Sequence, residues 1–204
     1  LNKGISMAAG EVIGFIHADD FLASSTVMTE VAQAFETHDL DACFGDLAYV
    51  RETDEGVVRV VRYWRAWRGE GGIVDSATVA HAFRWGWMPP HPTLFVKREL
   101  YEKLGGFRLD HGTAADYELM LRFLVKHRIR VGYVPKVLIA MRTGGKSNAT
   151  VAARVRANAM DRKAWRTNEL DPLPWTRLMK PLRKLPQWLP FGHKEWRVGA
   201  RVRT

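Results

Sequence analysis

The stretch that decides the fold reads Glu11-Val12-Ile13-Gly14-Phe15-Ile16-His17-Ala18-Asp19-Asp20. Its apolar, β-branched and aromatic residues predict a buried strand that ends in two adjacent carboxylates. Two ionised carboxylates beside apolar surroundings repel each other and are costly to desolvate unless a cation or hydrogen-bond donors compensate. Asp19 and Asp20 therefore indicate a site for Mg²⁺ or Mn²⁺ with positions left open for phosphate oxygens. The alternative is a solvated turn before the next helix.

The chain around this stretch alternates between helical and strand patterns. Strands are expected at residues 41–50, 57–67, 93–96, 129–134 and 137–142. Helices are expected at residues 1–9, 24–37, 73–83, 98–104 and 116–127. Such alternation is typical of an α/β layered domain. The three prolines within residues 87–92 predict an ordered, non-helical connection there.

Length and charge exclude several classes of protein. The 204 residues suffice for one domain with a real core, and no apolar run approaches the roughly 18–20 residues that cross a bilayer. The formal net charge is +9, but residues 1–150 contain 18 basic and 18 acidic residues. The excess positive charge therefore lies entirely in residues 151–204. Any electrostatic partner, such as a nucleic acid or an anionic membrane, is expected to bind that segment.

A second carboxylate, Asp116, stands at the start of the helix expected at residues 116–127. Small residues precede it and leave space in front of it, so Asp116 could act as a general base. The alternative is a helix cap that interacts with the helix dipole. Glu118, two residues later, is interpreted as a surface residue.

Two further segments carry polar groups that suit a substrate. In residues 141–147, Gly144 and Gly145 allow backbone amides to approach a phosphate, and Arg142 and Lys146 add positive charge. The spacing does not match a P-loop. His91 lies in a rigid Pro-His-Pro segment, where it could contact a substrate or bond to the backbone.

Taken in order, these motifs resemble those of family 2 glycosyltransferases. The resemblance runs over residues 1 to about 150 and rests on the motifs at residues 2–4, 14–20, 44–46, 88–96, 105–107, 115–122 and 144–147. It implies an A-type glycosyltransferase fold, a mixed sheet flanked by helices, that transfers a sugar with inversion from a nucleotide diphosphate donor. A UDP-sugar is the expected donor, and a glycan or lipid-linked acceptor of the cell envelope is expected.

The resemblance also implies roles for individual residues. Asp19 and Asp20 would bind the metal, although His17 stands where many members carry Asp or Asn, and Asp116 would be the catalytic base. Asp46 and His91 are candidates for the acceptor side. The donor would contact Asn2, Lys3, Arg142, Gly144, Gly145, Lys146 and Ser147.

Two departures from the family affect the expected organisation. Nothing here resembles the family's nucleotide-binding start, so we expect residues 1–150 to be a partial catalytic domain that by itself binds donor poorly. Residues 151–204 are expected to form a basic C-terminal segment. Within residues 172–190, apolar residues with Trp175 alternate with basic ones, as at an anionic membrane surface.

Alternative readings remain open at this point. The apolar stripe of residues 172–190 could instead pack back on the body. The whole chain could be a non-catalytic remnant that acts as a membrane-associated interaction domain. Binding of nucleic acid is the weakest alternative, because it does not explain a neutral body with paired carboxylates. The expected location is cytoplasmic, peripheral to the inner face of the cell membrane.

Overall fold

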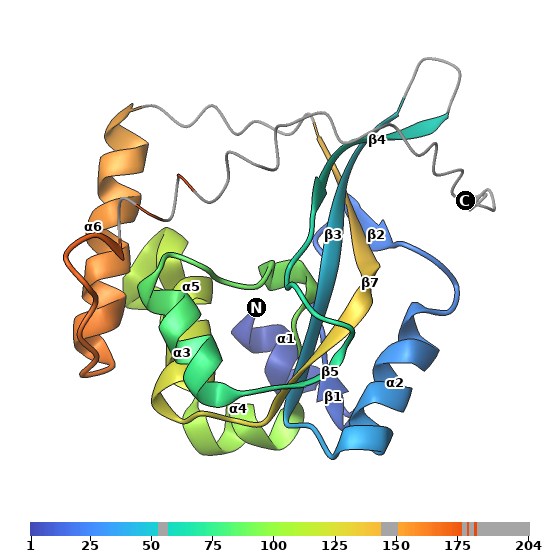
Figure 1. Ribbon diagram of the computed structural model, residues 1–204, viewed down its shortest axis with the longest axis horizontal. Coiled ribbons are helices and arrows are strands. Elements are labelled where there is room, and N and C mark those ends of the chain that lie inside the picture. Colours follow the sequence, from blue (N-terminus) through green and yellow to red (C-terminus); the bar gives the residue numbers. More distant parts are fainter. Residues whose placement is uncertain (53–56, 144–150, 177–178, 180–181, 183–204) are drawn as a thin grey trace.

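The computed structural model describes residues 1–52, 57–143 and 151–176, together with 179 and 182, and the side chains of residues 151–158 are not described (Figure 1). Within these residues one mixed sheet has the strand order β1-β6-β3-β7-β2, with β4 beside β3 and β5 beside β7. The strands are β1 (Val12–Ile13), β2 (Asp20–Leu22), β3 (Ala42–Glu52), β4 (Val58–Trp64), β5 (Gly72–Val74), β6 (Phe95–Lys97) and β7 (Val131–Arg142).

Helices cover both faces of this sheet. Figure 1 shows α2 on one face and the other helices on the opposite face. Their bounds are α1 (Asn2–Met7), α2 (Val27–His38), α3 (Ser76–Arg84), α4 (Arg98–Leu104), α5 (Ala115–Met120) and α6 (Val151–Thr167). A π-helical turn (Leu121–Lys126) continues α5, and a short 3₁₀ helix (His91–Thr93) precedes β6.

The centre of the sheet is the parallel pair of β3 and β7. Residues 42–48 of β3 are all buried, because helices lie over both faces of the strand. On one face, Val27, Val31 and Phe35 of α2 pack against β3 and β7. The larger core lies on the other face, where helices α3 to α6 meet the sheet.

The expected strand at residues 11–17 is present only in part. Strand β1 ends at Ile13, and Gly14 passes so close to Phe95 that a Cβ atom there would lie 2.4 Å from the ring. The chain then leaves the sheet and turns, and the Asp20 N–H donates to the carbonyl of His17 at 3.0 Å. The two carboxylates therefore lie between two short strands, in a turn that leads into β2.

Two other expected elements differ in extent. The two strands expected at residues 129–134 and 137–142 are one strand, β7, which begins at Val131 and whose register with β3 shifts around Pro135 and Lys136. The helix expected from Ile73 begins at Ser76, because Ile73 lies in β5 and Asp75 caps α3 by accepting from the Thr78 N–H at 2.7 Å. By contrast, α4 has the expected bounds.

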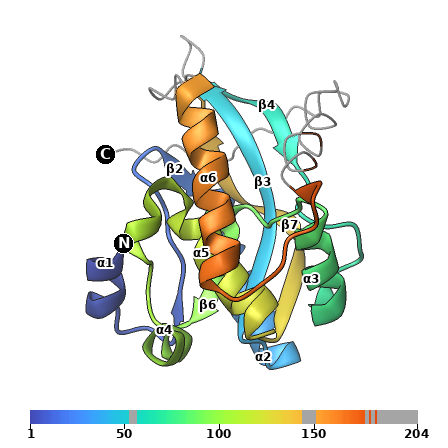
Figure 2. The same cartoon turned by 90° about the vertical axis from the view of Figure 1, so that its left-hand side faces the viewer.

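The first part of the basic C-terminal segment packs on the body (Figure 2). Ala164 and Trp165 of α6 belong to the larger core. The hydroxyl of Thr176 donates to the carbonyl of Arg84 at 2.5 Å, and the rings of Trp175 and Trp85 lie 5.8 Å apart. In the described part of the chain no helix is both long and apolar enough to span a bilayer.

Candidate active site

The first part of the candidate site is the carboxylate pair Asp19 and Asp20. Asp19 is exposed in the turn, and Asp20 is the first residue of β2, half-buried opposite Met141 of β7. Burial raises the pKa of Asp20 above its usual value, the nearby His17 opposes this shift, and Asp19 adds to it. The Oδ2 atom of Asp20 is buried and has no hydrogen-bond partner among the described residues. A buried carboxylate oxygen without a donor is costly, so this atom is suited to a cation.

The described residues contain no group of three or more His, Cys, Asp and Glu side chains that could hold a metal ion. A pair of carboxylates is nevertheless enough for Mg²⁺, which proteins often bind through one or two carboxylates together with substrate phosphates. The donor set formed by Asp19 and the unpartnered oxygen of Asp20 fits that chemistry. These oxygens are hard, anionic ligands, and Asp19 is exposed.

Two histidines lie between the predicted base, Asp116, and the turn that carries Asp19 and Asp20, which we call the acidic turn. The rings of His17 and His91 lie 6.0 Å apart, although 74 positions separate them in the sequence. His91 is only 8% exposed and packs between Phe15 and Phe107, with ring centroids at 6.1 and 5.7 Å. Burial lowers the pKa of His91, Asp116 opposes this shift, and His17 adds to it. His91 therefore lies within electrostatic reach of Asp116 and His17, and His17 lies within reach of Asp20.

Asp116 lies in the first turn of α5 and is half-buried. Its Oδ1 atom accepts a hydrogen bond from the N–H of Tyr117 at 2.7 Å. The position in the first turn also favours the ionised carboxylate through the helix dipole. The described interactions thus run from Asp20 through His17 and His91 to Asp116.

Glu118 is fully buried, so the expectation that it is a surface residue is wrong. Its carboxylate bonds both Nε and Nη2 of Arg122 at 3.0 Å and accepts from the amide of Asn168 at 3.2 Å. The Arg122 guanidinium also donates to the carbonyls of Gly105 at 2.8 Å and Gly106 at 2.6 Å. This buried pair fixes the turn that precedes Phe107.

Asn2, a predicted donor contact, is joined to the same turn. Its side-chain amide donates to the carbonyl of Phe107 at 2.9 Å and its oxygen accepts from the Phe107 N–H at 2.8 Å. The amide is thus used within the protein and ties α1 to the body. Lys3, the other predicted donor contact in α1, is exposed.

Arg142 ends β7 on the strand that borders the acidic turn. Its guanidinium pairs with Glu52 at 3.4 Å and lies 5.6 Å from the ring centroid of Phe21. Phe21 follows Asp20 in β2, so Arg142 is close to the acidic pair. The remaining predicted donor contacts, Gly144, Gly145, Lys146 and Ser147, lie outside the described residues.

Asp46, a predicted acceptor-side residue, is 2% exposed in β3. It accepts hydrogen bonds from the Ala66 N–H at 2.7 Å, from the Tyr133 hydroxyl at 2.8 Å and from the Tyr63 hydroxyl. Burial and the bond to Asp46 raise the pKa of both tyrosines. The carboxylate oxygens of Asp46 therefore have hydrogen-bond donors within the protein, whereas one oxygen of Asp20 has no donor among the described residues.

Comparison with known proteins adds to this geometry. No protein-family model matches the chain. The chain is 27% identical, across its whole length, to an uncharacterized protein of Mycobacterium tuberculosis, of which it covers 65%. Over 122 residues, which make up 60% of this chain and 42% of the other, it is 33% identical to an uncharacterized glycosyltransferase of the same species. The chain thus spans less than two thirds of the length of these curated relatives.

Solved structures show a similar fold. A structure of S. aureus TarS in complex with UDP has a TM-score of 0.50, and a second TarS structure has 0.51. Both are 14% identical in sequence, and the match covers 92% of this chain and 56% of the TarS chain. The mixed sheet flanked by helices and these neighbours confirm the expectation from the sequence. The chain has the α/β fold of A-type glycosyltransferases.

Proposed function

We propose that this protein is a family 2 glycosyltransferase that moves a sugar with inversion from a UDP-sugar to a hydroxyl group of a glycan or lipid-linked acceptor. The observation that carries the proposal is a series of neighbouring groups in this fold: Asp20, with its unpartnered buried oxygen, interacts with His17, the His17 ring lies beside His91, and His91 interacts with Asp116. Similarity to a named glycosyltransferase and to a structure that contains UDP supports the same class of reaction.

The acidic turn is assigned to the donor side. Asp19 and Asp20 would hold Mg²⁺ or Mn²⁺, which when bound neutralises negative charge on a leaving diphosphate. Arg142 adds fixed positive charge near the same place, and such charge stabilises a developing anion. Burial raises the pKa of Asp20, and a bound cation opposes this shift and favours the ionised carboxylate.

Asp116 is assigned to the acceptor side. Its carboxylate takes the proton of the acceptor hydroxyl as that oxygen attacks the anomeric carbon from the face opposite the leaving nucleotide. Its hydrogen bond to the Tyr117 N–H fixes the orientation of the carboxylate. His91, a largely buried ring positioned by Phe15 and Phe107, interacts electrostatically with Asp116.

Because residues 1–150 are expected to bind donor poorly by themselves, the proposal is tested in the full-length protein, by measuring UDP release from a panel of UDP-sugars with Mn²⁺ and with a chelator. We expect release that requires the metal and that falls in Asp19→Asn and Asp20→Asn. Asp39→Asn is the matched control, because Asp39 is an exposed aspartate at the end of α2 and its side chain is 83% accessible. Absence of release from every UDP-sugar, or equal rates in all three variants, would contradict the proposal.

Membrane contact remains a separate proposal for residues 172–190. The described beginning of this segment packs on α3 through Trp175 and Thr176, and most of the remainder lies outside the described residues. Basic residues with tryptophans suit an anionic lipid surface. Sedimentation with vesicles that contain anionic lipid, compared with neutral vesicles, tests it.

A further inference from the structure

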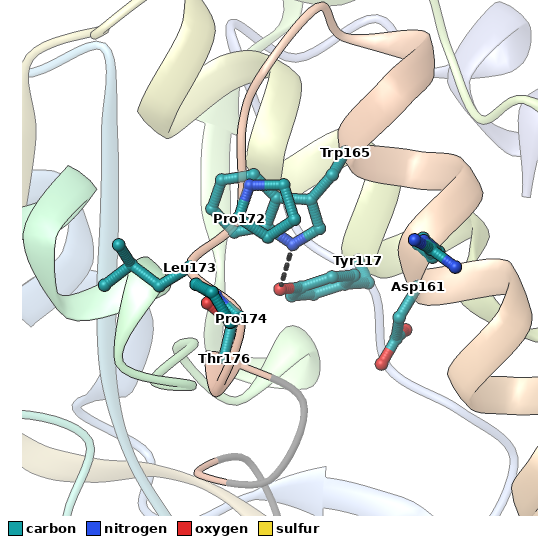
Figure 3. Close-up of a pocket in the computed structure, with 8 residues that line it drawn as sticks. Tyr117, Asp161, Trp165, Pro172, Leu173, Pro174 and Thr176 are labelled. Carbon is teal, nitrogen blue, oxygen red and sulfur yellow. Dashed lines mark hydrogen bonds between the residues drawn. The ribbon is translucent and has the colours of Figure 1, made fainter.

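A cavity of about 380 Å³ lies between α6, α5 and the segment that follows α6 (Figure 3). Its volume is in the range of about 300–1,000 Å³ that is typical of small-molecule sites. The residues that line it are Tyr117 of α5, Asp161, Arg162 and Trp165 of α6, and Pro172, Leu173, Pro174 and Thr176. None of them was singled out from the sequence as a candidate for substrate binding.

The walls of this cavity are held by hydrogen bonds. Trp165 donates from its indole N–H to the hydroxyl oxygen of Tyr117 at 3.0 Å, as Figure 3 shows, and both side chains are almost fully buried. On the opposite side, the bond from Thr176 to the carbonyl of Arg84 fixes the segment after α6 to α3. A site built in this way is formed before a ligand arrives, which reduces the entropy lost on binding.

The lining combines apolar rings with groups that bind hydroxyls. Pro172, Leu173 and Pro174 present aliphatic surface, while Asp161 can accept hydrogen bonds and Arg162 can donate them. A sugar ring has this same combination of C–H faces and hydroxyl groups.

The cavity is lined by the residue that follows the predicted base. Tyr117, which lines it, follows Asp116 in α5, and its N–H donates to the Asp116 carboxylate. Trp175 lies between the lining residues Pro174 and Thr176 and is 41% exposed. The cavity thus borders the helical turn that carries Asp116.

We propose that this cavity binds a sugar unit of the acceptor, so that the acceptor is a glycan of several units. The inference rests on the proposed function and adds the class of acceptor to it. Asp116 acts on the terminal hydroxyl, and the cavity binds a neighbouring unit of the same chain.

The test is saturation-transfer NMR on the chain with the methyl glycosides of glucose, galactose, mannose, rhamnose and N-acetylglucosamine. We expect at least one of them to bind, and Leu173→Trp, which fills the cavity, to weaken that binding by about tenfold or more. Met28→Trp is the matched control, since Met28 is 52% exposed on α2 and lies on the other face of the sheet. Arg162→Gln, at an exposed position, is a second variant that leaves the packing intact and is expected to weaken binding too.

Three results would overturn the inference. The first is that none of these glycosides binds, and the second is that the wild type, Leu173→Trp and Arg162→Gln bind equally. The third is that the cavity binds the alkyl chain of an alkyl maltoside and leaves its sugar free. Its failure is distinguishable from failure of the proposed function. A protein that releases UDP from a donor but binds no glycoside contradicts the cavity assignment alone. Glycoside binding that depends on Leu173, in a protein that releases no UDP, contradicts the transferase assignment and leaves the cavity site standing.

Discussion

Helix α5 carries two carboxylates, Asp116 and Glu118, whose surroundings differ sharply. Glu118 is fully buried and is compensated by Arg122 and Asn168. Asp116 is half-buried, accepts one backbone hydrogen bond and lies within electrostatic reach of His91. A carboxylate compensated by fixed partners stabilises the fold, whereas one that retains access can take part in proton transfer.

The same contrast extends to the regions around these two residues. In the Glu118 network, formed by Glu118, Arg122, Asn168 and the turn from Gly105 to Phe107 with Asn2, the charged groups have partners fixed by the fold, although the side-chain oxygen of Asn168 is buried without a partner among the described residues. The acidic turn has an exposed Asp19 and an Asp20 oxygen that lacks a partner. An unpartnered buried oxygen lowers stability, and its presence is explained if a ligand supplies the partner.

The largest effect on stability is expected for Glu118→Ala. The variant leaves the Arg122 guanidinium buried without its carboxylate, which typically costs about 3–5 kcal/mol. Urea denaturation measures the loss. Glu102→Ala is the control, because Glu102 pairs with Arg98 at 3.7 Å on an exposed surface, where such pairs contribute little. Equal stability of the two variants would show that the Glu118 network is not structural.

A smaller loss is expected for Asn2→Ala. The variant removes both hydrogen bonds to the backbone of Phe107, and leaving such groups without partners costs about 1–3 kcal/mol. Ser6→Ala, on the exposed face of α1, should change the free energy of unfolding much less. If Asn2→Ala left stability unchanged but weakened UDP binding, Asn2 would belong to the donor site and not to the network.

The smallest effect is expected when the pH dependence of stability is compared between the wild type and His91→Gln. Because burial lowers the pKa of His91 in the folded state, the unfolded chain takes up a proton first as the pH falls below about 6.5. The wild type should therefore lose more stability between about pH 7.5 and pH 5 than the variant. Asp20 has a raised pKa and shifts stability in the opposite direction on acidification, but it does so in both proteins. Identical losses in the two proteins would contradict the burial of a neutral His91.

Sequence patterns predicted much of the fold because local periodicity and stop signals determine elements such as α4 and β3. They failed at residues 14–19, where the close approach of Gly14 to Phe95 removes the chain from the sheet. Glu118 was misassigned because one of its partners, Asn168, lies 50 residues away in the sequence. The ordered motifs indicated Asp20 and Asp116, but the contact between His17 and His91 depends on the tertiary fold.

The most direct test of the central claim is to measure transfer rate and stability together in Asp116→Asn. With a UDP-sugar that the wild type uses, we expect the variant to transfer about 10²–10⁴-fold more slowly while the free energy of unfolding and the affinity for UDP stay close to those of the wild type. Transfer at a near wild-type rate by a folded Asp116→Asn would show that Asp116 is not the base and would contradict the account.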